Sequence, residues 1–165
     1  MGSQLRRNLF GWTMGHSIIN GSVNAVGIWF HSLSTKRNLF LMRNDKKYRG
    51  HWGLPGGKIE RNETLYDTIE RECIEEIGAM PDYIKLIPVE KFTANGNKFT
   101  YHTFFCVILN EFTPILNHEH VGYAWLDNGI IPKPLHPGFW STINVEEVMQ
   151  RVETAIDYYT SQCEI

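Results

Sequence analysis

Residues 56–79, GGKIERNETLYDTIERECIEEIGA, restrict the fold more than any other part of this sequence. The second half of the segment is expected to be helical, and it places Glu72, Glu75 and Glu76 close together. Like charges at such helical spacings repel and cost about 0.2–0.5 kcal/mol per pair. A helix that keeps these glutamates therefore needs a partner that offsets the repulsion.

Both ends of this helix are marked by capping residues. Thr64 is a suitable N-cap, and Asp67 three residues later can complete a capping box. Gly78 supplies a stop at the C′ position, and Pro81 follows shortly after it. The sequence therefore predicts a helix that ends at Glu76 or Ile77.

The predicted helix has two different faces. At about 100° per residue, the three glutamates lie within roughly 100° of one another. Tyr66, Cys73 and Ile77 point the other way, toward a core, and Ile69 lies near the border. Hard divalent cations such as Mg²⁺ prefer clustered oxygen ligands and keep waters or phosphates at their remaining positions. A metal site and a solvated acidic face are both consistent with the helix alone.

The composition is that of an ordinary globular protein, with 42% hydrophobic and 21% charged residues. A length of 165 residues predicts a single domain, 1–165, with a buried core. The net charge of −2 gives no global positive field, so nucleic acid is not expected as a partner. Three cysteines without CxxC spacing and only short apolar runs predict a cytoplasmic protein that does not cross a membrane.

Apolar segments rich in β-formers predict a sheet around the helix. Strands are expected at residues 24–32, 38–44, 83–94, 98–110 and 123–127. The polar residues 33–37 are expected to form a turn, and residues 54–63 an irregular loop. An amphipathic helix is expected over residues 144–162, where apolar side chains recur at helical spacing. Strands on both sides of one helix predict a mixed α/β layered domain.

The segment that begins at Gly57 resembles the signature of the Nudix hydrolases, G-x5-E-x7-R-E-U-x-E-E-x-G-U, in which U is a bulky apolar residue. The fixed positions are filled by Gly57, Glu63, Arg71, Glu72, Glu75, Glu76 and Gly78. Cys73 and Ala79 fill the apolar positions less typically. The resemblance implies a Nudix-type α/β/α sandwich with a mixed β-sheet and a loop–helix–loop. The N-terminal 20 residues and the helix 144–162 would extend the same domain.

The resemblance also implies a divalent metal site, with Mg²⁺ as the expected ion and Mn²⁺ as the alternative. Glu72 and Glu76 would be direct ligands, and Glu75 would bind the ion directly or through water. The main-chain carbonyl of Gly56 or Gly57 often completes the metal site in this family. These assignments agree with the acidic face inferred from the helix itself.

Other residues near the signature are expected to support the site or to bind substrate. Glu63 and Arg71 would pair across the loop and hold the geometry of the site. The two glycines, Gly56 and Gly57, would let a phosphate approach the main chain, and Lys58 is expected to bind substrate beside them. Arg43 stands where related triphosphatases place an Arg that meets the phosphates; a solvated strand-end charge is its alternative role.

Residues 117–127, NHEHVGYAWLD, resemble a loop and strand that reach over the metal site in several family members. Glu119 is therefore a candidate for a further metal ligand or for the general base. Glu75 is the other candidate for the base that takes a proton from the attacking water. His120 would take that part if the chain acted like its sugar-nucleotide relatives. A surface position without a chemical role is the alternative for His118 and His120.

The sequence lacks the markers of several substrate classes. Residues 94–95 contain no Pro of the kind that ADP-ribose enzymes tend to carry there, and residues 96–97 contain no Tyr typical of diadenosine polyphosphate enzymes. Residues 135–136 are Leu and His, where some relatives that act on oxidised purines place an Asn. An 8-oxo-purine substrate is therefore not supported by the sequence.

By elimination, the sequence predicts a Mg²⁺-dependent enzyme that cleaves a (deoxy)nucleoside triphosphate to a monophosphate and pyrophosphate. Hydrolysis of a nucleotide sugar such as GDP-mannose, of ADP-ribose or of a dinucleoside polyphosphate is the first alternative. A non-catalytic module that senses a nucleotide is the second, although a binding module need not keep all three glutamates. The expected partner is a small-molecule nucleotide, and a homodimer is compatible with the sequence.

Overall fold

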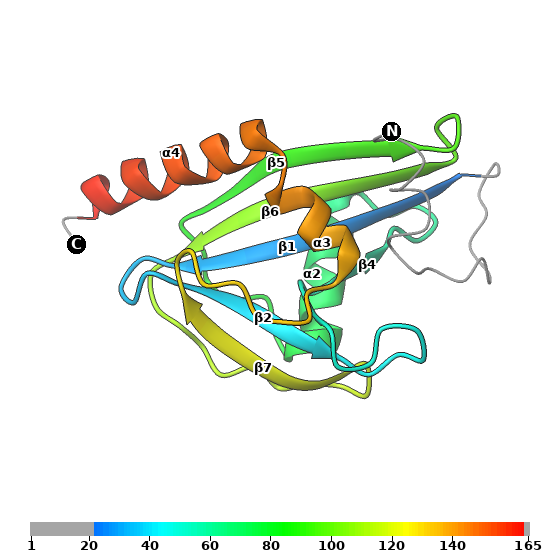
Figure 1. Cartoon of the computed structure of the whole chain (residues 1–165), viewed down its shortest axis with the longest axis horizontal. Coiled ribbons are helices and arrows are strands. Elements are labelled where there is room, and N and C mark those ends of the chain that lie inside the picture. The colour runs from blue at the N-terminus through cyan, green and yellow to red at the C-terminus, as the bar shows by residue number, and fades with distance from the viewer. Residues whose placement is uncertain (1–21, 164–165) are drawn as a thin grey trace.

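Strands β1 (Val23–Ser32) and β6 (Phe99–Ile108) run side by side in the same direction within one mixed sheet (Figure 1). The computed structural model describes residues 22–163, so the extension expected for residues 1–20 lies outside the described part. All other pairings among the described strands are antiparallel. The sheet is therefore mixed, as the sequence predicts.

Five further strands complete the sheet. They are β2 (Arg37–Arg43), β3 (Trp52–Gly53), β4 (Gly56–Lys58), β5 (Lys85–Ala94) and β7 (His120–Asp127). The main path is β3-β2-β1-β6-β5, with β4 paired to β1 and β7 paired to β2. The five strands expected from sequence are confirmed, although β7 begins three residues earlier than predicted.

The irregular loop predicted for residues 54–63 is wrong in part, because it contains β4. This strand pairs with the N-terminal half of β1, from Ala25↔Lys58 to Gly27↔Gly56, whereas β2 pairs with the C-terminal end of β1. A three-residue strand that begins with two glycines has little intrinsic β-propensity, so its pairing with a distant strand forms it.

The sheet separates two apolar clusters. Helix α2 (Leu65–Ile77) covers one face through Ile69, Cys73 and Ile77. Helices α3 (Pro137–Ile143) and α4 (Glu146–Gln162) cover the other face, where Val148 and Val152 are buried. Figure 1 shows α2 and α3 on opposite sides of the sheet. This arrangement confirms the α/β/α sandwich, and no described helix is long and apolar enough to span a bilayer.

Helix α2 begins and ends as predicted. Thr64 and Asp67 form the capping box, and Gly78 takes the left-handed conformation with φ 92°. The prediction that Tyr66 points toward the core is wrong, because its side chain is 59% exposed. Ile69, expected near the border, is buried instead. The apolar face of α2 is thus rotated toward Ile69, which also turns two of the glutamates inward.

Candidate active site

The acidic side of α2 is enclosed over part of its length rather than solvated. Glu72 and Glu76 are 7% and 2% exposed, whereas Glu75 is exposed. The main-chain N–H of Gly56 donates a hydrogen bond of 2.7 Å to Oε2 of Glu76. Two carboxylates are therefore held between α2 and β4, and a simple solvated face does not describe this helix.

The two glycines of β4 permit this close approach. Gly56 has φ 148°, and a Cβ there would collide with the main-chain carbonyl of Val26 on β1. A Cβ at Gly57 would collide with the carboxylate of Glu72. The glycine pair therefore lets β4 lie against both β1 and the α2 glutamates without displacing the Val26 main chain or the Glu72 carboxylate.

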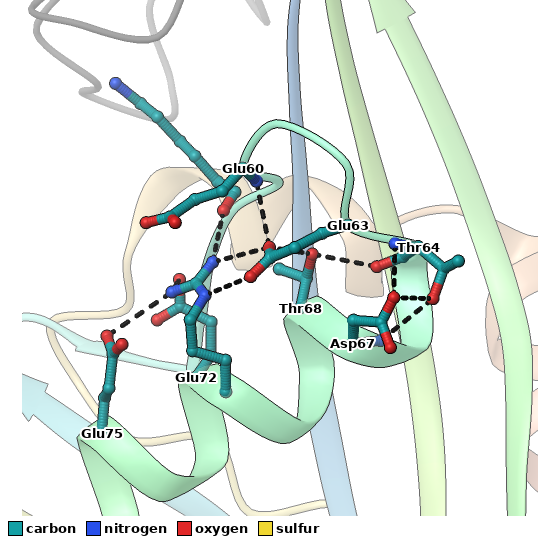
Figure 2. Close-up of polar contacts among 9 residues, drawn as sticks. Glu60, Glu63, Thr64, Asp67, Thr68, Glu72 and Glu75 are labelled. Atoms are coloured by element: carbon teal, nitrogen blue, oxygen red, sulfur yellow. Dashed lines mark hydrogen bonds and ion pairs between the residues drawn. The ribbon is translucent and has the colours of Figure 1, made fainter.

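Arg71 connects the loop before α2 with the helix, and Figure 2 labels its partners Glu63, Glu72 and Glu75. Its Nε and Nη2 donate to the two carboxylate oxygens of Glu63, at 2.7 and 3.1 Å. Its Nη1 donates to Glu72 at 2.9 Å, and Nη2 also donates to the main-chain carbonyl of Lys58 at 2.9 Å. A weaker contact of 3.5 Å reaches Glu75. The ion pair expected between Glu63 and Arg71 is present, and it orients the guanidinium toward Glu72.

The glutamates around Arg71 differ in their acidity. Hydrogen bonds from Arg71 lower the pKa of Glu63 to about 2, despite some burial. Burial raises the pKa of Glu72 to about 7, although Arg71 opposes this shift. Burial and the nearby Glu72 raise the pKa of Glu76 well above its usual value. The fold therefore disfavours the charged forms of Glu72 and Glu76 as long as no cation lies beside them.

A basic loop faces these carboxylates across a cleft of about 910 Å³. Arg43, at the end of β2, lines the cleft together with Lys46, Lys47 and Lys58. Asp45 pairs with Nε of Arg43 and accepts hydrogen bonds from the main-chain N–H of Lys47. The cleft thus has an acidic wall on α2 and a basic wall, which consists of Arg43 of β2, Lys46 and Lys47 of the following loop, and Lys58 of β4.

The segment before β7 contributes a further carboxylate to the cleft. Glu119 and His118 are exposed and line the cleft. After burial, which is the main cause, the charge of Glu119 also helps to raise the pKa of Glu72 and of Glu76. Glu119 therefore lines the same cleft as Glu72, Glu75 and Glu76.

His120 lines the cleft but is buried. It is the first residue of β7 and is 7% exposed, so a surface loop position is wrong for this residue. Burial lowers the pKa of His120 to about 4, and the positive charge of Arg43 acts in the same direction. The imidazole is therefore neutral near pH 7, and its Nδ1 has no hydrogen-bond partner among the described residues.

The cleft also contains residues that the motifs do not single out, Asn44, Asp45 and Glu60. Asp45 closes a turn by accepting from the main-chain N–H groups of Lys47 and Tyr48, at 3.1 and 3.0 Å. Adjacent Asn and Asp at the start of a loop are typical of such turns. That local signal predicts the turn but does not predict that it lines the cleft.

The donor set of the acidic wall suits a hard divalent cation. In the described residues, no three Asp, Glu, His or Cys side chains are already grouped so that they could hold a metal ion. One oxygen of Glu72 bonds to Arg71 and one of Glu76 bonds to Gly56, which leaves each carboxylate a second oxygen. A cation beside two buried carboxylates would also relieve their repulsion, and oxygen ligands are those that Mg²⁺ prefers.

The sequence matches the model of a known protein family. The model described as "NUDIX domain" matches residues 22–143. A putative 8-oxo-dGTP diphosphatase 3 of Mycobacterium tuberculosis is 30% identical over 111 residues, which cover 64% of this chain and 48% of that protein. The nucleoside triphosphatase NudI of Escherichia coli is 32% identical over 90 residues, covering 48% of this chain and 63% of that one. The chain therefore spans about half the length of the mycobacterial relative.

A solved structure shows the same fold. The NUDIX domain of NrtR from Shewanella oneidensis, crystallised with ADP ribose, superposes with a TM-score of 0.64 at 17% identity. The match covers 79% of this chain and 88% of that one. At this level of identity the likeness concerns the fold alone.

Proposed function

This chain belongs to the NUDIX domain family, and we propose that it is a divalent-metal-dependent pyrophosphohydrolase acting on a (deoxy)nucleoside triphosphate. One observation carries the proposal: the cleft that holds Glu72 and Glu76 also holds Arg43 and Lys46. This arrangement supports a cation site and a phosphate site within one cleft. The printed names of two relatives, a diphosphatase for 8-oxo-dGTP and a nucleoside triphosphatase, support a triphosphate substrate.

Glu72 and Glu76 are proposed as the direct ligands of Mg²⁺ or Mn²⁺. Glu75 would bind directly or through water, and the carbonyl of Gly57 would add a main-chain oxygen. A bound divalent cation neutralises phosphate charge and lowers the pKa of a coordinated water. Within the protein, Arg71 fixes the direction of the Glu72 carboxylate, and Glu63 in turn fixes Arg71.

The basic wall is proposed to bind the phosphates. Arg43 can grip a phosphate through two parallel N–H donors, whereas Lys46, Lys47 and Lys58 act as point charges. Asp45 holds the Arg43 side chain, which limits its conformational freedom before substrate binds. An anion that enters the cleft therefore meets oriented donors on one wall and the cation site on the other.

In the proposed reaction, a water attacks a phosphorus atom next to the α–β phosphoanhydride oxygen. The bond between that phosphorus and the bridging oxygen breaks, a carboxylate takes a proton from the attacking water, and the products are the monophosphate and pyrophosphate. Glu119 is the preferred base because it is exposed in the cleft near Glu72 and Glu76. His120 is a weaker choice, because its side chain is buried and so is less open to a water in the cleft than that of Glu119. Glu75, also exposed in the cleft, is the second choice.

The test is a panel of nucleotides incubated with the protein and Mg²⁺, with products resolved by chromatography. The panel contains the common triphosphates, 8-oxo-dGTP, ADP-ribose, a nucleotide sugar and a dinucleoside polyphosphate. We expect triphosphates to give a monophosphate and pyrophosphate, and EDTA to stop the reaction. The printed name of the mycobacterial relative keeps 8-oxo-dGTP in the panel although the sequence gives it no support.

Each other outcome points to a different function. Release of a sugar phosphate, or of ribose phosphate from ADP-ribose, would mean that the substrate is a nucleoside diphosphate derivative and not a triphosphate. Binding without any turnover would indicate a nucleotide-sensing module. Either result would contradict the proposal.

A further inference from the structure

Asn44 connects the basic wall of the cleft to the segment that bears Glu119. The main-chain N–H of Asn44 donates to the carbonyl of Glu119 at 2.8 Å. The side-chain Nδ2 of Asn44 donates to the carbonyl of His118 at 2.9 Å. One residue at the end of β2 therefore binds two consecutive carbonyls of the opposite segment.

Asn117 closes a local turn within the same segment. Its Oδ1 accepts from the main-chain N–H of Glu119 at 3.0 Å. Glu119 thus has its N–H bonded by Asn117 and its carbonyl bonded by Asn44, although its own side chain is exposed. Asn44 thus anchors the segment before β7 to the end of β2, and Asn117 fixes the local turn at Glu119.

A β-bulge lies next to this contact. Met42 pairs with Gly122, but the next residue, Arg43, pairs with His120, so Val121 has no partner on β2. In a regular ladder Arg43 would oppose Val121, since pairing advances one residue at a time. Bulges bend a strand and re-aim the side chains beside them. Here the bulge shifts the register of β7 by one residue. Asn44, which follows Arg43, lies against His118 and Glu119.

We propose that Asn44 is a positioning residue for Glu119: it holds the 117–120 segment so that the Glu119 carboxylate faces the buried carboxylates of α2. This inference rests on the proposed function, in which Glu119 acts on the attacking water or on the cation. Asn44 itself need not touch the substrate. Asn44 acts through two hydrogen bonds, one from its main-chain N–H and one from its side-chain amide. A substitution removes only the bond from the side chain.

The kinetic test is a double-mutant cycle between Asn44→Ala and Glu119→Gln. Asn44→Ala removes one neutral hydrogen bond from the segment that holds Glu119. Its loss is expected to lower kcat about two- to tenfold, with KM little changed. In the Glu119→Gln background the same substitution should change kcat less than about twofold, because a positioning residue has nothing left to position. Equal fold-changes in both backgrounds, or no effect of Glu119→Gln alone, would overturn the proposal.

Asn144→Ala is the matched control. The Nδ2 of Asn144 also donates to a main-chain carbonyl, that of Trp140, at 2.7 Å, but it caps α3 and does not line the cleft. Both variants lose one amide-to-carbonyl hydrogen bond in an exposed setting. An Asn144→Ala variant that slows turnover as much as Asn44→Ala would show a general stability effect and overturn the proposal.

Amide hydrogen exchange tests the contact without reference to turnover. Exchange in the 117–120 segment should be at least about threefold faster in Asn44→Ala than in the wild type and in Asn144→Ala, because local opening becomes easier. Unchanged exchange would overturn the positioning role even in an active enzyme. Faster exchange in a protein that hydrolyses no nucleotide would support the contact and overturn the proposed function instead.

Discussion

The carboxylate of Glu72 occupies the place where a side chain at Gly57 would begin. Because residue 57 lacks a Cβ, β4 lies directly against α2, and the neighbouring N–H of Gly56 reaches Glu76. Gly57 thus allows the close packing of β4 against α2 that positions the carboxylates of Glu72 and Glu76. Its role concerns the geometry of the candidate site more than the stability of the sheet.

Gly57→Ala is therefore expected to move the Glu72 carboxylate out of place. Because a flexible side-chain end can turn away, the free energy of unfolding should change by less than about 1 kcal/mol, while kcat falls more than about tenfold. Turnover and urea unfolding measure the two effects. Gly122→Ala is the control, since a Cβ there meets Met42 at an ordinary 3.8 Å. Full activity of Gly57→Ala would contradict the geometry proposed for Glu72.

Glu63→Gln is expected to lower stability at neutral pH by about 1.5–3 kcal/mol, the usual contribution of charged hydrogen bonds. The pKa of Glu63 is lowered to about 2, so its contribution is complete above the unfolded value of 4.5 and is lost as the pH falls toward 2. The stability difference between wild type and Glu63→Gln should therefore stay constant above about pH 5 and shrink as the pH falls from 5 toward 2. The exposed Glu153 provides the control Glu153→Gln. A difference that does not depend on pH would exclude the ion pair as its cause.

Glu76→Gln should stabilise the metal-free protein at alkaline pH. Burial raises the pKa of Glu76 well above its usual value and that of Glu72 to about 7, so ionisation disfavours the folded state once the pH exceeds 4.5. The Tm of Glu76→Gln in EDTA should exceed that of the wild type by an amount that grows from pH 5 to pH 8. The buried histidines are present in both proteins, so their contributions to the pH dependence of Tm are expected to cancel in the Tm difference.

Mg²⁺ should reverse this order at pH 8. A cation that binds Glu72 and Glu76 stabilises the folded wild type by mass action, and it should bind the variant less tightly. Thermal unfolding with and without Mg²⁺ measures both shifts. A Tm difference that is constant with pH, or an equal Mg²⁺ effect on both proteins, would argue against buried ionised carboxylates.

Arg43→Lys is expected to raise KM about tenfold, because an ammonium cannot reproduce the two parallel hydrogen bonds of a guanidinium. It also breaks the contact of Nε with Asp45. The charge-conserving swap Lys46→Arg serves as the control and should leave KM within about twofold. Indistinguishable kinetics for the two variants would remove Arg43 from the phosphate site.

The sequence predicts α2 well because its signals are local. Thr64, Asp67 and Gly78 act within one turn of the helix ends, and the structure confirms all three. The orientation of the helix is less well predicted, since Tyr66 is exposed and Ile69 is buried. A helical period gives the relative positions of side chains, but packing against the sheet selects which of them turn inward.

Other features depend on contacts between distant residues and leave no local pattern. β4 exists because Gly56–Lys58 pairs with β1, and α3 begins at Pro137 with His136 as its cap, in a stretch for which no helix is predicted. The sequence indicates three glutamates on one side of α2, yet only the neighbouring β4 explains why Glu72 and Glu76 are buried. The Asn44 contact likewise depends on a bulge in β7.

The most direct test of the account compares nucleoside triphosphate hydrolysis by wild type, Glu76→Gln and Glu70→Gln in Mg²⁺. Both variants remove one carboxylate from α2, but Glu70 is exposed and does not line the cleft. Loss of a metal ligand should lower kcat by about 100-fold or more, since a bound metal contributes several kcal/mol, while Glu70→Gln should stay within about twofold of the wild type. A Glu76→Gln enzyme that keeps more than about half of the wild-type rate would contradict the metal site on which the proposed function depends.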